Sequence, residues 1–170
     1  NKWNQVVKKA EKLINSKDVI HPYFNLLSLS LSQLGKNEKA ESFLIDGIKK
    51  FPSEISLRSN IALIQILLKK LQDAGKNLEV ANKINKDDIH TLFAMANLKR
   101  EENKFEEAVE ILKKVCEKNV KFPKALMLLG QTYLDLAQQK NDKNFYNLAY
   151  PSSKKRTARR QSKFREENCP

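Results

Sequence analysis

Glycine and proline are scarce in this chain, which has 4 Gly and 5 Pro among its 170 residues. A sandwich or barrel of short strands needs many turns, and these two residues supply a large share of them. Long apolar runs are also missing, since the longest one, residues 61–68, is short and contains Gln65. The sequence therefore favours a helical protein, and we expect no membrane-spanning segment.

Cysteine is nearly absent, and Cys116 and Cys169 are too few for a disulfide framework. Cys116 lies within an apolar helical pattern, which predicts a small core residue. Cys169 is the penultimate residue and is expected to be exposed. This usage indicates a reducing compartment, and we expect a cytoplasmic protein.

Patterns typical of catalysis are missing as well. His21 and His90 have no cysteine or carboxylate at the spacing of metal ligands. There is no glycine-rich phosphate loop and no Gly-x-Ser-x-Gly elbow. We therefore predict that the chain is not itself an enzyme and uses no cofactor and no metal.

Positive charge is abundant, with a formal net charge of +12. The tail, residues 151–170, has seven Lys/Arg, and four of these are Arg. The only arginines among residues 1–150 are Arg58 and Arg100. One interpretation is a disordered or non-native end, which short charged runs often are. Another is a nuclear address or a nucleic-acid contact, because clustered basic residues attract phosphates. Residues 159–162 would also suit a basophilic kinase.

The sequence repeats with a period of 34 residues, counted from His21. The eighth position of each unit is small and the twentieth is alanine. The aligned residues are Ser28, Ala62, Ala96 and Gly130 at the eighth position, Ala40, Ala74 and Ala108 at the twentieth, and Leu44, Leu78 and Leu112 at the twenty-fourth. A fixed period of this length is typical of stacked helix pairs.

The period divides the chain into units, each predicted to hold two helices. We predict the second helix of a truncated leading unit at 1–20, units at 21–54, 55–88 and 89–122, a partial unit at 123–150 and the basic tail at 151–170. In the first unit the helices should run from Pro22 to Leu34 and then to Lys50, because Pro52 biases Phe51 away from helical angles. The second unit has no glycine between its helices, so its break is expected near residues 70–72.

In the third unit we expect helices at 88–101 and 104–118, with Asp87 or Asp88 as the N-cap. The first helix of the second unit is apolar almost all round, which predicts burial on every side.

The units resemble tetratricopeptide repeats, whose pattern runs aromatic, Leu-Gly, Tyr, Ala, Phe, Pro. The matching residues are Leu129, Gly130 and Tyr133 in the fourth unit, Ala40, Leu44 and Pro52 in the first, and Phe105, Ala108 and Leu112 in the third. The chain departs from the pattern where the leading aromatic survives only as Phe24 and where Lys86 replaces the proline. The resemblance implies an all-α solenoid of stacked antiparallel helix pairs, with a right-handed superhelix.

The resemblance also implies a scaffold that binds a peptide or helix of another protein in a concave groove. In this family the first helix of each unit lines the groove with its second, fifth, sixth, ninth, twelfth and thirteenth positions, which we call the inward positions. The groove residues carried over are Asn25, Leu29, Asn60, Leu63, Phe93, Asn97, Arg100, Lys124, Met127 and Gln131. The clamp with which one subclass holds a carboxylate is matched only at Asn60, so we reject that specificity.

Other hypotheses stay open. The chain starts at Asn1 and is expected to be a fragment, so it could be the substrate-docking part of a larger transferase. Self-association through open array ends is possible. Association with nucleic acid through the basic surface is a third hypothesis, although we consider nucleic acid an unlikely partner.

Gly130 interrupts a strongly periodic helix, at a cost of about 1 kcal/mol relative to alanine. Its alignment with three small residues predicts close packing against a second helix starting near Asp142. That helix lacks the expected alanine and leucine. Either residues 145–149 form a shortened partner, or Gly130 faces solvent or another molecule.

Overall fold

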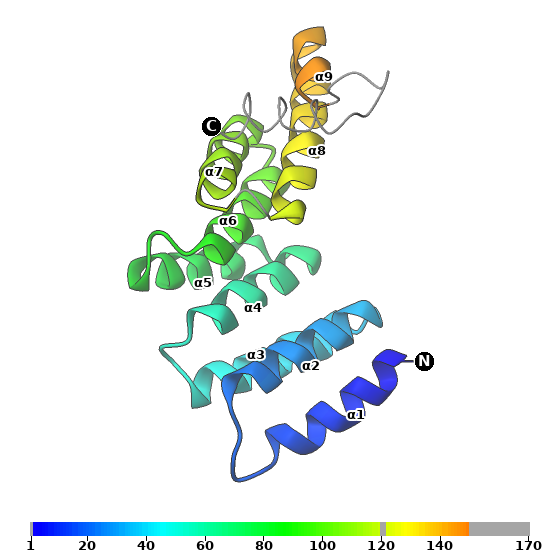
Figure 1. The fold of residues 1–170 in the computed structure, drawn as a ribbon, viewed down its shortest axis with the longest axis vertical. Helices are drawn as coiled ribbons and strands as arrows, with labels where there is room; N and C mark the ends of the chain where they lie inside the picture. Colours follow the sequence, from blue (N-terminus) through cyan, green and yellow to red (C-terminus); the bar gives the residue numbers. More distant parts are fainter. Residues whose placement is uncertain (1, 120–121, 150–170) are drawn as a thin grey trace. The chain divides into compact units, whose positions relative to one another are not determined.

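The computed structural model describes residues 2–119 and 122–149, and this part of the chain is helical without any β-strand (Figure 1). The helices are α1 (Lys2–Ile14), α2 (His21–Gln33), α3 (Asn37–Lys50), α4 (Ile55–Leu67), α5 (Leu71–Ile84), α6 (Ile89–Glu101), α7 (Phe105–Lys118), α8 (Pro123–Lys140) and α9 (Lys143–Ala149). The basic tail, Cys169 and the kinase-type motif at 159–162 lie outside the described residues. None of the described helices is long and apolar enough to cross a membrane.

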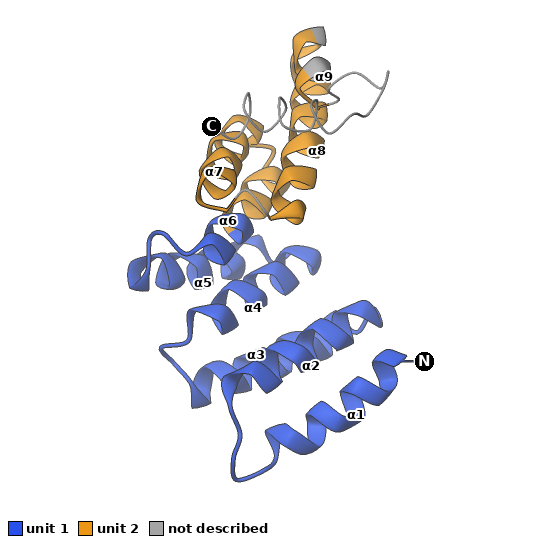
Figure 2. Cartoon of the chain, viewed as in Figure 1, with its two compact units in different colours: residues 1–94 blue, residues 95–170 orange. Residues whose placement is uncertain are grey.

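The chain forms two compact units, residues 1–94 and 95–170, and their border falls within α6 (Figure 2). In the first unit each helix from α1 to α4 packs against the next one, and α2 also packs against α4. In the second unit α8 packs against both α7 and α9. Successive helices run antiparallel as pairs, which confirms the all-α prediction of stacked helix pairs.

The helix starts follow the sequence period. α2, α4, α6 and α8 begin at His21, Ile55, Ile89 and Pro123, each 34 residues after the last. The helices expected in the first and third units are confirmed, and the break of the second unit lies at residues 68–70. The division into repeat units remains a prediction.

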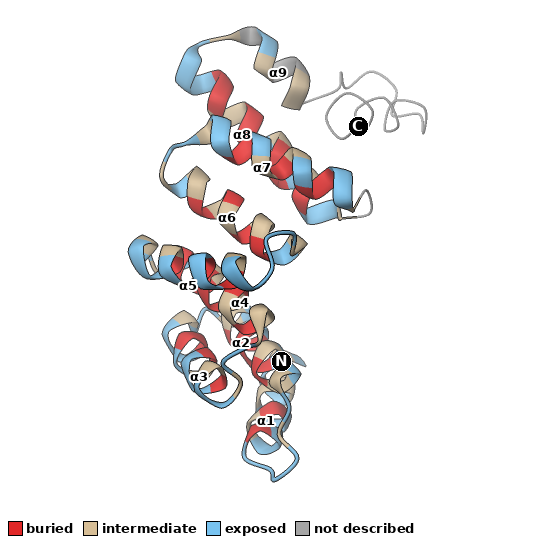
Figure 3. Ribbon diagram, turned by 90° about the vertical axis from the view of Figure 1, so that its left-hand side faces the viewer, coloured by how far each residue is buried: buried red, intermediate tan, exposed pale blue. Residues whose placement is uncertain are grey.

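The core uses the small and apolar positions that recur in the sequence. Each described helix from α1 to α8 has buried residues beside residues that are partly or fully exposed (Figure 3). The repeated residues Ser28, Ala62, Ala96, Ala40, Ala74, Ala108, Leu44, Leu78 and Leu112 are all buried, and so is Cys116 as predicted. Small side chains at the eighth and twentieth positions let neighbouring helices approach closely, and the leucines fill the space between them.

The complete burial predicted for α4 is wrong at its end. Leu57, Ile61 and Ile64 are buried, but Leu67 is 58% exposed. Leu67 is the last residue of the helix and occupies the thirteenth position of its unit, which is an inward position.

The turn between the two helices of a unit has the same backbone form three times. Gly35, Lys69 and Asn103 all have positive φ angles, of 72°, 60° and 58°. In each case the amide of the next residue donates to a carbonyl five residues back, as from Lys70 to Gln65 at 2.8 Å. This is the hydrogen-bond pattern of a Schellman cap. It ends α2, α4 and α6 at equivalent points.

The links between units use proline in one place and polar caps in another. The chain leaves α3 at Phe51, directly before Pro52, as predicted. After α5, where Lys86 stands in place of the proline, the Asp87 amide donates to Asn85 Oδ1 at 2.9 Å. Asp88 then accepts a hydrogen bond from the Thr91 amide at 3.0 Å, which confirms Asp88 as the N-cap of α6.

α8 continues beyond the point where the other first helices end. It runs to Lys140, and the left-handed residue that closes it is Asn141, with φ 51°. The following helix, α9, is short and begins at Lys143. A Cβ atom added to Gly130 would lie 3.5 Å from the Ala149 carbonyl oxygen, so α9 is the shortened partner of this glycine.

Candidate functional site

The first unit places the inward positions of two neighbouring helices side by side. α2 and α4 pack against each other directly, without a second helix between them. We call the surface they form the α2–α4 face. It consists of Asn25, Leu26 and Leu29 from α2 and of Ser56, Asn60, Leu63 and Leu67 from α4.

Side-chain amides join the two helices of this face. Asn25 Nδ2 donates to Ser56 Oγ at 3.0 Å, and Asn60 Nδ2 donates to Asn25 Oδ1 at 2.8 Å. Asn25 and Asn60, both predicted as groove residues, are therefore in direct contact. A buried bond between the Ser59 and Thr91 hydroxyls, at 2.9 Å, joins α4 to α6 in the same way. These bonds set the register between neighbouring first helices.

The leucines of the face are open to solvent. Leu26 is 43% exposed and Leu29 is 49% exposed, while Leu63 is half-buried between its neighbours. Leu67 extends the apolar row to the end of α4. The face therefore combines apolar side chains with a polar line of one serine and two asparagines.

Charged residues are missing from the α2–α4 face. α2 has no Asp, Glu, Lys or Arg, and α4 has only Arg58. Arg58 occupies the fourth position of its unit, where α2 has the buried Phe24, and its Nη2 donates to the Pro52 carbonyl at 3.3 Å. The Arg58 guanidinium therefore forms its hydrogen bond outside the α2–α4 face, because the fourth position is not an inward position.

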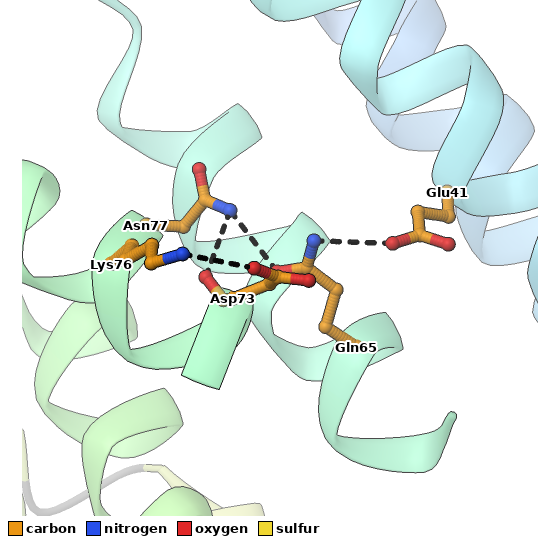
Figure 4. Close-up of polar contacts among 5 residues, drawn as sticks. All are labelled: Glu41, Gln65, Asp73, Lys76 and Asn77. Atoms are coloured by element: carbon orange, nitrogen blue, oxygen red, sulfur yellow. Dashed lines mark hydrogen bonds and ion pairs between the residues drawn. The ribbon is translucent and has the colours of Figure 1, made fainter. Parts of the chain in front are cut away.

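A buried polar network holds α4 from the opposite side (Figure 4). Gln65 is buried; its Nε2 donates to Glu41 on α3 at 3.1 Å, and its Oε1 accepts from Asn77 on α5 at 3.0 Å. The Lys70 ammonium contacts the other Glu41 oxygen at 2.6 Å. This hydrogen bond raises the pKa of Lys70 above its usual value. The network fixes α4 between α3 and α5 and so positions the face.

The predicted groove residues of the second unit differ in character. Arg100 donates through Nε to Asp135 Oδ2 at 3.1 Å, and its Nη2 also bonds to that oxygen. Met127 is 65% exposed, and Lys124 and Gln131 are exposed as well. The Arg100 guanidinium would have to leave Asp135 in order to hold an acidic group of a ligand.

The remaining predicted residues lie on α6. Phe93, in the first unit, and Asn97, in the second, are half-buried there. No cluster of three or more His, Cys, Asp or Glu side chains within the described ranges is placed to hold a metal ion.

Sequence reasoning missed several residues of the site. Ser56 was not selected, although it aligns with the inward second position, and Leu67 was assigned to a fully buried helix. The 34-residue alignment could have identified both, because Leu67 occupies the inward thirteenth position. The Glu41–Gln65–Asn77 network left no signal in the sequence, since its members occupy unrelated positions of the period.

Comparison with known proteins identifies a tetratricopeptide repeat within this chain. A family model described as tetratricopeptide repeat matches residues 89–117. The structure is similar to that of TTC0263, a thermophilic TPR protein of Thermus thermophilus, with a TM-score of 0.73 over 96% of this chain and 89% of that one. Residues 89–117 are therefore a tetratricopeptide repeat, and the structure has the fold of tetratricopeptide repeat proteins.

Other tetratricopeptide-like matches agree on the fold alone. A crystal structure of MamA matches with a TM-score of 0.64 over 97% of this chain and 90% of that one. Sequence identity is 12% to TTC0263 and 11% to MamA, so these likenesses extend no further than the fold. A comparison with curated proteins finds no significant match. Tetratricopeptide repeats are generally scaffolds for protein–protein interaction.

Proposed function

We propose that this protein binds a polypeptide segment of a partner protein on the α2–α4 face, which the inward positions of these two first helices form. One observation carries the proposal. Among the described residues of α2, α4, α6 and α8, the exposed large apolar side chains all occupy inward positions. They are Leu26, Leu29, Leu67 and Met127.

The position of these side chains has a physical meaning. An exposed leucine or methionine costs solvation free energy, and the same helices bury most of their other apolar residues. Scattered single apolar residues need no explanation, but three of them on the neighbouring inward positions of α2 and α4 indicate a surface kept for a partner.

Asn60 supplies a polar contact at the centre of this surface. Its Nδ2 is bonded to Asn25, whereas its Oδ1 has no hydrogen-bond partner within the part of the chain that the structure describes. An asparagine carbonyl accepts hydrogen bonds, so it is suited to a backbone amide of a bound segment. The apolar side chains would supply contact area and Asn60 would supply orientation.

Site-specific photo-crosslinking tests this proposal. A benzoylphenylalanine is placed at Leu29 and, as a matched control, at Ile45 of α3, which is 41% exposed but lies on a second helix. With extract of the source cells, we expect a covalent polypeptide adduct at Leu29, no adduct at Ile45, and loss of the adduct when Leu67→Glu is added. Equal adducts at both sites, or none at Leu29, would refute the proposal.

A further inference from the structure

We propose that the segment bound on the α2–α4 face is uncharged and presents at least two large apolar side chains. This inference rests on the proposed function and adds the chemistry of the ligand. It follows from how charged and apolar side chains are distributed over the first unit.

The helices that form the α2–α4 face differ in charge from the second helices of the same unit. The whole chain carries a formal net charge of +12, and 31% of its residues are charged. Yet the face-forming helices α2 and α4 contribute only Arg58, which is bonded to Pro52. The second helices α3 and α5 carry ion pairs instead, such as Lys49–Asp46 and Lys76–Asp73. The neutrality is local to α2 and α4 and stands against the composition of the chain.

Burying a charged ligand on this face would cost free energy. A charged group that loses water without an opposite charge or enough hydrogen bonds is strongly disfavoured. The α2–α4 face has no charged side chain, and the amide groups of Asn25 are already bonded to Ser56 and Asn60. An acidic or basic side chain docked here would find too few partners, whereas an apolar side chain would lose no hydrogen bonds.

The apolar side chains of the face form one row on each helix. Leu26 and Leu29 are three residues apart on α2, and Leu63 and Leu67 are four residues apart on α4, so each pair shares one face of its helix. Two short apolar rows therefore lie on adjacent helices, with the Asn25–Asn60 pair among them. A ligand covering both rows needs an apolar side chain for each.

A random peptide library displayed on phage tests the inference with the chain itself as bait. The baits are the unmodified chain, Leu29→Glu and, as a control of similar exposure on a second helix, Ile45→Glu. Circular dichroism and thermal melting establish that all three are equally folded. The net charge of +12 makes acidic peptides the expected background, so enrichment of neutral apolar peptides would run against that background.

We expect the enriched peptides to be neutral, with two or more large apolar residues. The Kd of a selected peptide should rise about tenfold or more with Leu29→Glu. With Ile45→Glu it should stay within about twofold, a free-energy change well below about 1 kcal/mol. Binding should also depend little on salt.

The possible failures are distinguishable. Acidic or basic peptides that still lose binding with Leu29→Glu would overturn this inference and leave the proposed function intact. Peptides whose binding is unaffected by Leu29→Glu, or equally affected by Ile45→Glu, would overturn both, as would no enrichment at all. A dimer of the unliganded chain that dissociates with Leu29→Glu would show that a second copy covers the face, and would overturn the inference.

Discussion

At the scale of single residues, Lys69 occupies a position that glycine takes in the preceding unit. Lys69 and Gly35 both have left-handed backbone angles at the end of a first helix. A side chain other than glycine in this conformation costs about 1 kcal/mol, because its Cβ crowds the following carbonyl. The Schellman hydrogen bond from Lys70 to Gln65 maintains the angle despite this cost.

Lys69→Gly is therefore expected to raise the free energy of unfolding by about 1 kcal/mol. The reciprocal change Gly35→Ala should lower it by a similar amount, since nothing lies within 4 Å of an added Cβ there and only the backbone angle matters. Urea denaturation followed by circular dichroism measures both. A destabilising Lys69→Gly would show that contacts of the lysine side chain outweigh the backbone cost.

Two helical glycines provide a second residue-scale prediction. A Cβ added to Gly47 on α3 would lie 2.9 Å from Cγ of the buried Phe24 ring, too close for any real contact. A Cβ added to Gly130 on α8 would lie 3.5 Å from the Ala149 oxygen, an ordinary contact distance. The same substitution should therefore have opposite effects at the two sites.

Gly130→Ala is expected to stabilise the protein by about 1 kcal/mol through helix propensity. Gly47→Ala gains the same propensity but overpacks the core, so we expect a net loss of about 1 kcal/mol or more. Because propensity cancels between the variants, the difference in their unfolding free energies isolates the packing. Equal effects at the two sites would contradict the close approach of Gly47 to Phe24.

At the scale of elements, α3, α4 and α5 are joined by a carboxylate that is almost out of solvent. Glu41 is buried, with Gln65 on one oxygen and Lys70 on the other. Removing the lysine would leave this charge without its cation, and an uncompensated buried charge is more costly than a missing surface pair. Lys76 provides the comparison, because its partner Asp73 is about half exposed.

Lys70→Met is expected to lower the melting temperature clearly more than Lys76→Met, and to have little effect in a Glu41→Gln background. The pH dependence follows from the sign of the shift. The pKa of Lys70 is raised in the folded state above the usual 10.5, so its contribution is complete below about pH 10.5 and is lost as the pH rises through the folded value. Melting curves from neutral to alkaline pH check this. A difference in melting temperature between the parent chain and Lys70→Met that persists at the highest pH measured would contradict this expectation.

At the scale of the whole molecule, the period and the charge pattern carry different information. The 34-residue period sets where first helices begin, whereas the charges are placed mainly on other helices than α2 and α4. A strongly basic protein thus presents a neutral face. That contrast, and not the net charge, is what points to the chemistry of its ligand.

The sequence by itself determined the helices, their starts and the small buried positions. These signals act within a few residues, so they can be recognised without a structure; examples are the helical periodicity, Pro52 and the cap at Asp88. The resemblance to tetratricopeptide repeats implied that Asn25 and Asn60, at the fifth and sixth positions of neighbouring units, face the same side, and the two side chains are in contact.

Only the tertiary structure decided the pairings between distant residues. No periodic signature marks Asp135 as the partner of Arg100, or the link from Glu41 through Gln65 to Asn77. Such features depend on which side chains meet across helices, and that is determined by packing between elements.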